Sequence, residues 1–294
     1  MAISTESQAR QRLIEQVNIV KTESGLRNPL RYQGRGDPIA AKLGIVIQET
    51  ILPFNDGDYL EAKPPEIPDP IIRIDLSKGD QERINFTYFH EVSHHLMRQD
   101  DLLFSFLSEY TWGESFDITL ERFCNIGAAE FLVPGREVRE IIDEKGFRIT
   151  LLEELDQLYE ASKPAVAIQL AQCASHPCFV CVCEYGILQD GRQNQPSFIR
   201  MQTSTVPQLY IQYTSRSPSV KNYSLARFTK IPRNHFLSNV YQNRATSRSR
   251  APIPFRSGKV WEVDCEAFYY RGKVYAAFHL EASPPPRSLQ QRMF

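Results

Sequence analysis

The sequence has no long hydrophobic run, almost no net charge and no disulfide framework. No apolar stretch reaches the roughly 18 residues that a membrane helix needs, and the opening residues MAISTESQARQRLIEQV lack the hydrophobic core of a secretory signal. With a formal net charge of −1, a protein that works mainly by holding phosphates is disfavoured, although a local basic patch is not excluded. We therefore expect a cytoplasmic protein that does not associate with membranes.

The cysteines and the overall composition fit an ordinary globular protein. Six cysteines lie mostly within hydrophobic stretches, which indicates reduced thiols rather than the bridges of a small secreted domain. A chain of 294 residues with 42% hydrophobic content can bury a substantial core and can form two domains.

Helical and strand-like patterns alternate along the first half of the chain, which predicts an α+β fold. Short β-branched runs at 42–52 and 70–77 predict strands of a small sheet, and helical periodicity covers 6–22, 80–99, 120–132 and 137–145. After Pro177, five alternating or β-branched runs, one of them SFIRMQT at 197–203, predict a second, sheet-rich domain. The predicted parts are a first domain at 1–146, a connector at 147–176, a sheet domain at 177–284 and a flexible tail at 285–294.

Residues 149–174 have the outline of a helix-turn-helix. Its second helix offers little for reading DNA, with Lys163 as its basic residue and Gln169 and Gln172 as polar ones. We therefore expect a packing element or connector, and we do not expect direct DNA binding.

The stretch FHEVSHHLM at 89–97 places titratable side chains in the apolar middle of a helix. His90, Glu91 and His94 form H-E-x-x-H, a spacing that puts both imidazoles on one helical face, one turn apart, where they can bind one metal ion. Glu91 then lies beside the ion, where it could take a proton from water. Because buried histidine and glutamate side chains need partners, a metal site explains this motif better than a surface helix with scattered polar groups.

A catalytic zinc site needs a third protein ligand, and two residues compete for that role. Asp100 follows His94 at the metzincin distance, but Met97 stands where that motif needs a glycine to turn the chain. Glu121 belongs to a separate predicted helix and resembles the first residue of the gluzincin E-x-x-x-D arrangement. We therefore rank Glu121 first and Asp100 second.

Three further residues are candidates for supporting roles around the metal. Asn125 stands where gluzincins have Asp and could hold a ligand histidine by accepting its N–H. His95 points about 100° away from His94, so we expect it behind the ligands or at the surface. Tyr88 or His95 could supply a second donor to the reacting carbonyl oxygen, and the sequence does not choose between them. Glu130, half a helical turn round from Glu121, is expected to face solvent.

These motifs together resemble the ImmA/IrrE metallopeptidases. TYFHEVSHHLM followed by ERFCNIGAAEFLVP is similar to the family pattern H-E-x-x-H, then E-x-x-x-N-x-x-A-x-x-L-L-x-P, and is close to its IrrE (PprI) branch. QDDLLFSFLSEY and PFRSGKVWEVDCEAF also resemble IrrE segments, so the resemblance covers most of the chain.

The resemblance implies three parts: a gluzincin-like peptidase domain, a helix-turn-helix-like connector and a C-terminal GAF-like sensor domain. It implies His90, His94 and Glu121 as metal ligands and Glu91 as the catalytic base. It also implies a zinc-dependent endopeptidase, with manganese open as the physiological metal, that cleaves an XRE-family (DdrO-like) repressor in a radiation or desiccation response. A small-molecule or redox signal at the GAF-like domain would regulate it.

Two alternatives stay open from the sequence. The first is an ImmA-like protease that acts on a mobile-element repressor. The second is a non-proteolytic stress sensor that binds DNA through 149–174 and uses its metal structurally, which would require a closed site with four ligands.

Overall fold

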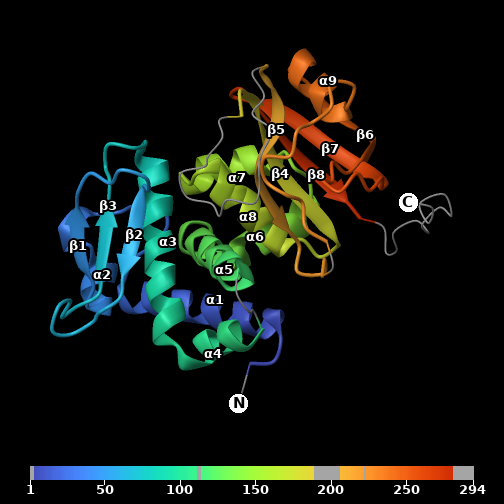
Figure 1. The fold of residues 1–294 in the computed structure, drawn as a ribbon. Coiled ribbons are helices and arrows are strands. Elements are labelled where there is room, and N and C mark those ends of the chain that lie inside the picture. The colour runs from blue at the N-terminus through green and yellow to red at the C-terminus, as the bar shows by residue number, and fades with distance from the viewer. Residues whose placement is uncertain (1–2, 111–113, 189–205, 222, 281–294) are drawn as a thin grey trace. The chain divides into compact units, whose positions relative to one another are not determined.

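The structure is a computed structural model that describes residues 3–110, 114–188, 206–221 and 223–280 (Figure 1). It confirms the α+β class: a small mixed sheet, a helical region and a five-stranded antiparallel sheet near the C-terminus. The chain folds into two compact units, residues 1–140 with 152–169 and residues 141–151 with 170–294. The domain boundaries expected from the sequence stay a prediction.

The first unit contains a three-stranded sheet in the order β1-β3-β2. Its elements are α1 (Glu6–Glu23), α2 (Pro38–Leu43), β1 (Val46–Glu49), β2 (Gly57–Leu60) and β3 (Ile71–Ile74). β1 runs parallel to β3 and β2 runs antiparallel to it. β1 and β3 fall within the predicted strands, whereas β2 was not predicted.

Helices form the rest of this part of the chain. They are α3 (Gln81–Gln99), α4 (Asp101–Tyr110), α5 (Glu114–Leu132), α6 (Gly135–Lys145), α7 (Leu151–Tyr159) and α8 (Lys163–Cys173). In Figure 1, α3 stands between the small sheet on one side and α1 and α5 on the other, and it contacts all of them. The helix predicted at 120–132 begins six residues earlier, at Glu114, and α4 was not predicted.

Two aspartates fix where α3 and α4 begin. The Asp80 side chain accepts from the Arg83 amide at 3.0 Å, which satisfies one of the donors that a helix start leaves open. The Asp100 carboxylate does the same for α4, accepting from Leu102 and Leu103 at 3.0 and 3.1 Å. α3 and α4 are therefore separate helices, divided at Asp100.

The second unit holds the five-stranded sheet in the order β5-β4-β8-β7-β6. Its elements are β4 (Cys178–Gly186), β5 (Gln208–Arg216), α9 (Phe236–Asn243), β6 (Thr246–Pro252), β7 (Glu262–Tyr270) and β8 (Lys273–His279). The strand predicted at 197–203 lies outside the described residues. β6 is an edge strand. Neither β6 nor α9 was predicted.

The core of this sheet unit is apolar and includes three of the six cysteines. Phe179, Cys181, Cys183, Trp261 and Cys265 are among its buried members. All six cysteines of the chain lie in its described part, are buried and form no disulfide, as expected from their apolar surroundings. None of the helices in the described ranges is long and apolar enough to cross a membrane.

Candidate metal centre

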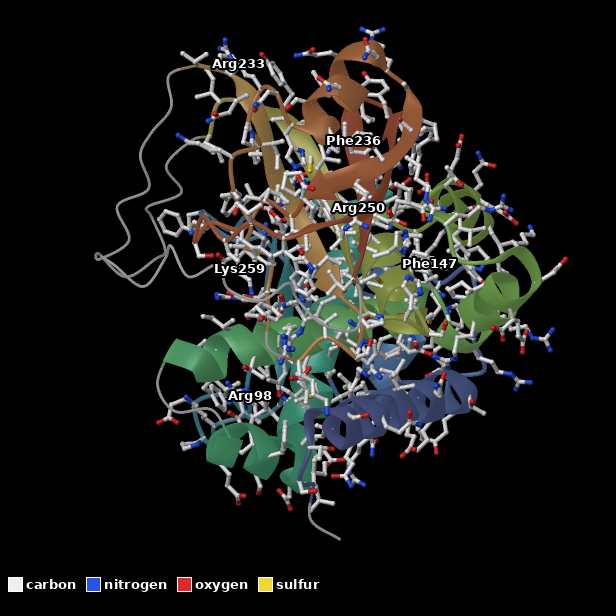
Figure 2. The ribbon with its side chains drawn as sticks, turned by 90° about the vertical axis from the view of Figure 1, so that its right-hand side faces the viewer. Arg98, Phe147, Arg233, Phe236, Arg250 and Lys259 are labelled. Atoms are coloured by element: carbon white, nitrogen blue, oxygen red, sulfur yellow. The ribbon has the colours of Figure 1, made fainter. Side chains whose placement is uncertain are left out.

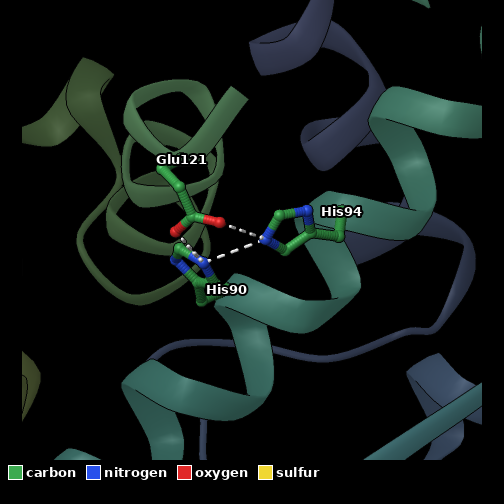
Figure 3. A group of neighbouring side chains, drawn as sticks. All are labelled: His90, His94 and Glu121. Atoms are coloured by element: carbon green, nitrogen blue, oxygen red, sulfur yellow. Dashed lines mark hydrogen bonds and ion pairs between the residues drawn. The ribbon is translucent and has the colours of Figure 1, made fainter. Parts of the chain in front are cut away.

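His90 and His94 lie one turn apart on the same face of α3, as their spacing requires. Their Nε2 atoms are 3.1 Å apart and both side chains are 13% exposed (Figure 3). The two imidazole rings are therefore mostly buried but still accessible to solvent.

Glu121 reaches the same point from α5. Its two carboxylate oxygens lie 3.2 Å from His90 Nε2 and 3.3 Å from His94 Nε2, and Figure 3 shows all three groups pointing toward one another. Zinc bonds of about 2.0–2.2 Å in a tetrahedron place neighbouring donor atoms about 3.3–3.6 Å apart. The three donors thus fit one tetrahedral ion, and with 57% of its side chain exposed Glu121 leaves an open side for water. Within the described ranges, this is the one group of three such residues close enough to hold an ion.

A close crossing of α3 and α5 brings Glu121 to the histidines. Ser93 is fully buried on α3, and its hydroxyl donates to the Phe89 carbonyl at 2.7 Å. Gly127 on α5 lies directly against it: a Cβ at this position would stand 2.4 Å from Ser93 Oγ and 2.9 Å from Ser93 Cβ. Because only a glycine leaves this space, Gly127 sets how closely the two ligand-bearing helices approach.

Asn125 fixes the orientation of His90. The Asn125 Oδ1 atom lies 3.1 Å from His90 Nδ1 and accepts its N–H, so Nε2 is the ring atom that faces the cluster. Burial lowers the pKa of His90, but the hydrogen bond to Glu121 and the charges of Glu91 and Glu121 outweigh it, and the pKa is raised. Burial opposes the ionisation of Glu121 as well, yet the hydrogen bonds from both histidines leave its pKa far below normal.

Glu91 is 7% exposed and lies beside the two ligand histidines on α3. Burial raises its pKa against the opposing charges of His90 and His94. A Cβ added at Gly57, where β2 begins, would lie 3.4 Å from Glu91 Cγ, so the strand passes close to this carboxyl. Such a group accepts a proton more readily than an exposed carboxylate, which suits a general base.

The structure gives other partners to two predicted supporting residues. The Tyr88 hydroxyl donates to Asp37 at 2.6 Å, and the ring is fully buried. His95 is also buried; its Nδ1 atom lies 3.1 Å from the Tyr59 hydroxyl, and burial lowers its pKa to about 4. Neither side chain has a contact with the three donors, so both are positioned to support the fold around the centre.

Asp100, the second-ranked ligand, does not join the cluster. One carboxylate oxygen caps α4, and the other accepts from Arg12 at 2.6 Å and from Gln16 at 3.3 Å. This carboxylate is therefore committed to joining α1 to the start of α4.

Glu130 does not face solvent, so that expectation was wrong. It is 4% exposed, and its carboxylate accepts from the Gln169 amide at 2.5 Å and from the Gly135 N–H at 3.2 Å. Gln169, a possible DNA reader in the sequence, is 2% exposed and is occupied by this contact. The far side of α5 is therefore covered by other elements of the first unit.

Two contacts near Glu91 could not be found from sequence spacing. Asp58 on β2 forms a two-pronged ion pair with Arg73 on β3, at 2.7 and 2.5 Å, and the charge of Asp58 contributes to the raised pKa of Glu91. The half-buried Phe86 ring lies 6.3 Å from the His90 ring, one turn earlier on α3. In the sequence, the one signal for these contacts was the stretch NDGD at 55–58, whose last two residues begin β2.

The donor set and the fold define a class: an H-E-x-x-H helix with a glutamate from a second helix, as in metal-dependent peptidases. The profile of the IrrE N-terminal-like domain matches residues 40–171. The radiation response metalloprotease IrrE of Deinococcus deserti is 29% identical over 201 residues, which are 68% of each chain. The same protein of Deinococcus radiodurans is 28% identical over 205 residues, 70% of this chain and 62% of the relative, so less than two thirds of that protein is spanned.

Residues 40–171 therefore match an IrrE N-terminal-like domain, and the chain is similar to the IrrE metalloproteases at 28–29% identity, as its motifs predicted. Its His90, His94 and Glu121 cluster fits an HExxH-plus-glutamate zinc site. A solved Mycobacterium tuberculosis transcriptional regulator matches with a TM-score of 0.54 over 92% of this chain and 76% of its own, at 16% identity. That likeness concerns the fold alone.

Proposed function

We propose that this chain is a site-specific metalloendopeptidase that cleaves an XRE-family (DdrO-like) repressor and so induces DNA-damage and oxidative-stress genes. The observation that supports it most is the convergence of His90, His94 and Glu121 on one point with an exposed side. The IrrE relatives are named as radiation response metalloproteases, and such an enzyme acts on a protein.

In the proposed reaction, His90, His94 and Glu121 hold the ion. When bound, a zinc ion supplies Lewis acidity that polarises the peptide carbonyl and makes water acidic enough to react near neutral pH. Glu91 takes the proton from the attacking water and passes it to the amide nitrogen as the C–N bond breaks. Asn125 keeps His90 in the Nδ1–H form that leaves Nε2 available.

Zinc is the proposed ion because two imidazoles and one carboxylate in a tetrahedral arrangement suit it. Manganese as the physiological metal is the alternative, since the site is open and contains oxygen donors. To decide between the two metals, zinc or manganese is added to metal-stripped protein and cleavage of the repressor is measured.

The remaining parts of the proposal concern regulation. We propose that the second unit is a GAF-like sensor and that α7 and α8 form a helix-turn-helix-like connector between it and a gluzincin-like peptidase part. The antiparallel sheet with one helix beside it supports a sensor of this type. Trp261 and Phe268 in this unit are each 3% exposed and are core residues.

Glu91→Gln tests the reaction. The amide cannot accept the proton, so cleavage of the repressor should fall by at least about 100-fold while the bound metal stays at the parent level. Full-length protein is loaded with zinc or manganese and incubated with candidate repressors, and products are located by mass spectrometry. Glu140→Gln, a 64% exposed glutamate, is the matched control and should cut at the parent rate. Cleavage by Glu91→Gln at the parent rate would remove Glu91 from the mechanism.

A further inference from the structure

The near-zero net charge conceals a division between the two units. Residues 1–140 and 152–169 contain 16 Lys and Arg against 27 Asp and Glu, a net charge of −11. Residues 141–151 and 170–294 contain 18 basic against 8 acidic residues, a net charge of +10. The second unit is therefore strongly cationic, which the whole-chain value of −1 does not reveal.

Much of this charge lies on two loops of the sheet unit that touch each other. We call Lys221, Arg227, Lys230, Arg256 and Lys259 the basic loop cluster. All except the half-buried Lys259 are exposed, and Figure 2 labels Lys259 on this unit.

Hydrogen bonds join the two loops that carry the cluster. Arg256 donates to the Arg227 carbonyl at 2.6 Å, and the Lys259 ammonium donates to the Tyr223 hydroxyl at 3.0 Å. The Tyr223 ring lies 5.4 Å from Trp261, and Trp261 is buried in the core of the unit. The cations are thus presented by an anchored surface rather than by a free tail.

Three cations of this cluster, Arg227, Arg256 and Lys259, contact carbonyl groups, a hydroxyl or aromatic rings rather than carboxylates. Arg227 donates to the Gln212 carbonyl at 2.8 Å and lies 5.1 Å from the rings of Tyr213 and Phe228. Lys259 lies 4.2 Å from the Tyr223 ring. Within the described ranges none of the five forms an ion pair with an acidic side chain, whereas Arg248 and Arg250 on β6 both pair with Asp264.

We propose that the basic loop cluster is a binding surface for the phosphate backbone of nucleic acid. Cationic side chains on two touching loops repel one another unless counter-charges neutralise them, and nucleic acid carries a charge at every nucleotide. Arginine and lysine interleaved with aromatic rings are typical of such surfaces. The surface is distinct from the α7–α8 pair, where direct DNA reading was not expected, and it requires no base recognition.

An acidic protein is the competing occupant, including the acidic unit of a second copy. The phosphate backbone is favoured because the cluster spreads exposed cations over two loops, which suits a continuous row of fixed charges. A membrane surface is disfavoured because anionic lipid binding of this kind relies on an amphipathic helix with a large apolar face, and the cluster lies on loops.

The test measures binding of the full-length chain to a fluorescein-labelled 24-base-pair duplex by anisotropy, as a function of salt. Five phosphate contacts predict a slope of log K against log salt near about −4.5, an affinity loss of about 500-fold between 50 and 200 mM salt. Neutralising Arg227, Arg256 and Lys259 to Gln should flatten the slope by about three units. The same triple variant should stay folded, with the circular-dichroism spectrum of the parent, although it loses the hydrogen bonds that Arg256 and Lys259 make between the loops.

The matched control neutralises three exposed cations of the acidic unit, Arg35, Lys42 and Arg136, to Gln. It changes the net charge equally and should leave the slope unchanged. Three results would overturn the proposal: no binding at 50 mM salt, an equal loss in both triple variants, or binding to polyglutamate with no binding to DNA. A salt-sensitive dimer by light scattering without DNA affinity would assign the surface to self-association instead.

Discussion

Gly127→Ala tests whether the contact between α3 and α5 controls the metal centre. Alanine improves helix propensity by about 1 kcal/mol at an ordinary helical position. Here its Cβ would meet Ser93 Oγ at 2.4 Å and Ser93 Cβ at 2.9 Å, and overpacking of this kind costs about 1–3 kcal/mol. We therefore expect a net loss of up to about 2 kcal/mol in the free energy of unfolding.

The metal centre should respond as well as the stability. Glu121 and Asn125 lie on the same helix as Gly127, so an outward shift of α5 withdraws one ligand and the partner of another. Zinc affinity should fall about 10-fold, the lower end of the effect of losing a partner that orients a metal ligand. A competition assay with a chromophoric chelator measures this, and urea unfolding measures the stability.

Gly36→Ala is the matched control, because no atom lies within 4 Å of a Cβ added there and the backbone does not require glycine. Ser93→Ala combined with Gly127→Ala removes the shortest contact and should recover part of both losses, which a double-mutant cycle would quantify. If Gly127→Ala binds zinc and unfolds like the parent, the close crossing does not position Glu121.

Two further predictions concern polar contacts away from the ligands. Gln169→Leu removes a hydrogen-bond donor from the buried Glu130 carboxylate and should lower the free energy of unfolding by about 1–3 kcal/mol in urea, with the exposed Gln11→Leu near neutral. Burial and the nearby His279 lower the pKa of His176, so the unfolded chain takes up its proton first and stability falls as pH drops below about 6.5. His176→Asn should remove this pH-dependent loss of stability, so the melting temperature should decline less steeply from pH 6.5 to 5 in the variant than in the parent. Parallel melting profiles for variant and parent would contradict the role of His176.

The elements that the sequence predicted well are those set by local patterns. The H-E-x-x-H spacing and the apolar stripe of α3 are fixed by helix geometry, so the pairing of His90 with His94 followed from the sequence. Asn125 was also found by spacing, because a residue one turn from Glu121 must share its face. The cluster geometry fits these assignments, and the role of each residue stays a proposal.

The features that were missed depend on contacts between distant segments. β2 has four residues and begins with a glycine and an aspartate, which are rare in strands, and it is a strand because it pairs with β3 and packs on α3. β6 is an exposed edge strand, where alternation of apolar residues is not required. Glu130 was assigned to solvent by its angle around the helix, an argument that fails when both sides of α5 are covered.

The bond between Gln169 and Glu130 bears on how short a working fragment of this protein can be. A piece ending at residue 146 would keep the two imidazoles and the acidic ligand. The buried Glu130 carboxylate, on the same helix as that ligand, would then lose its hydrogen bond from Gln169. Extending the piece beyond residue 169, close to where the family profile ends at 171, restores the amide. An expression boundary chosen from the catalytic motif alone would therefore cut through the protein's own interior.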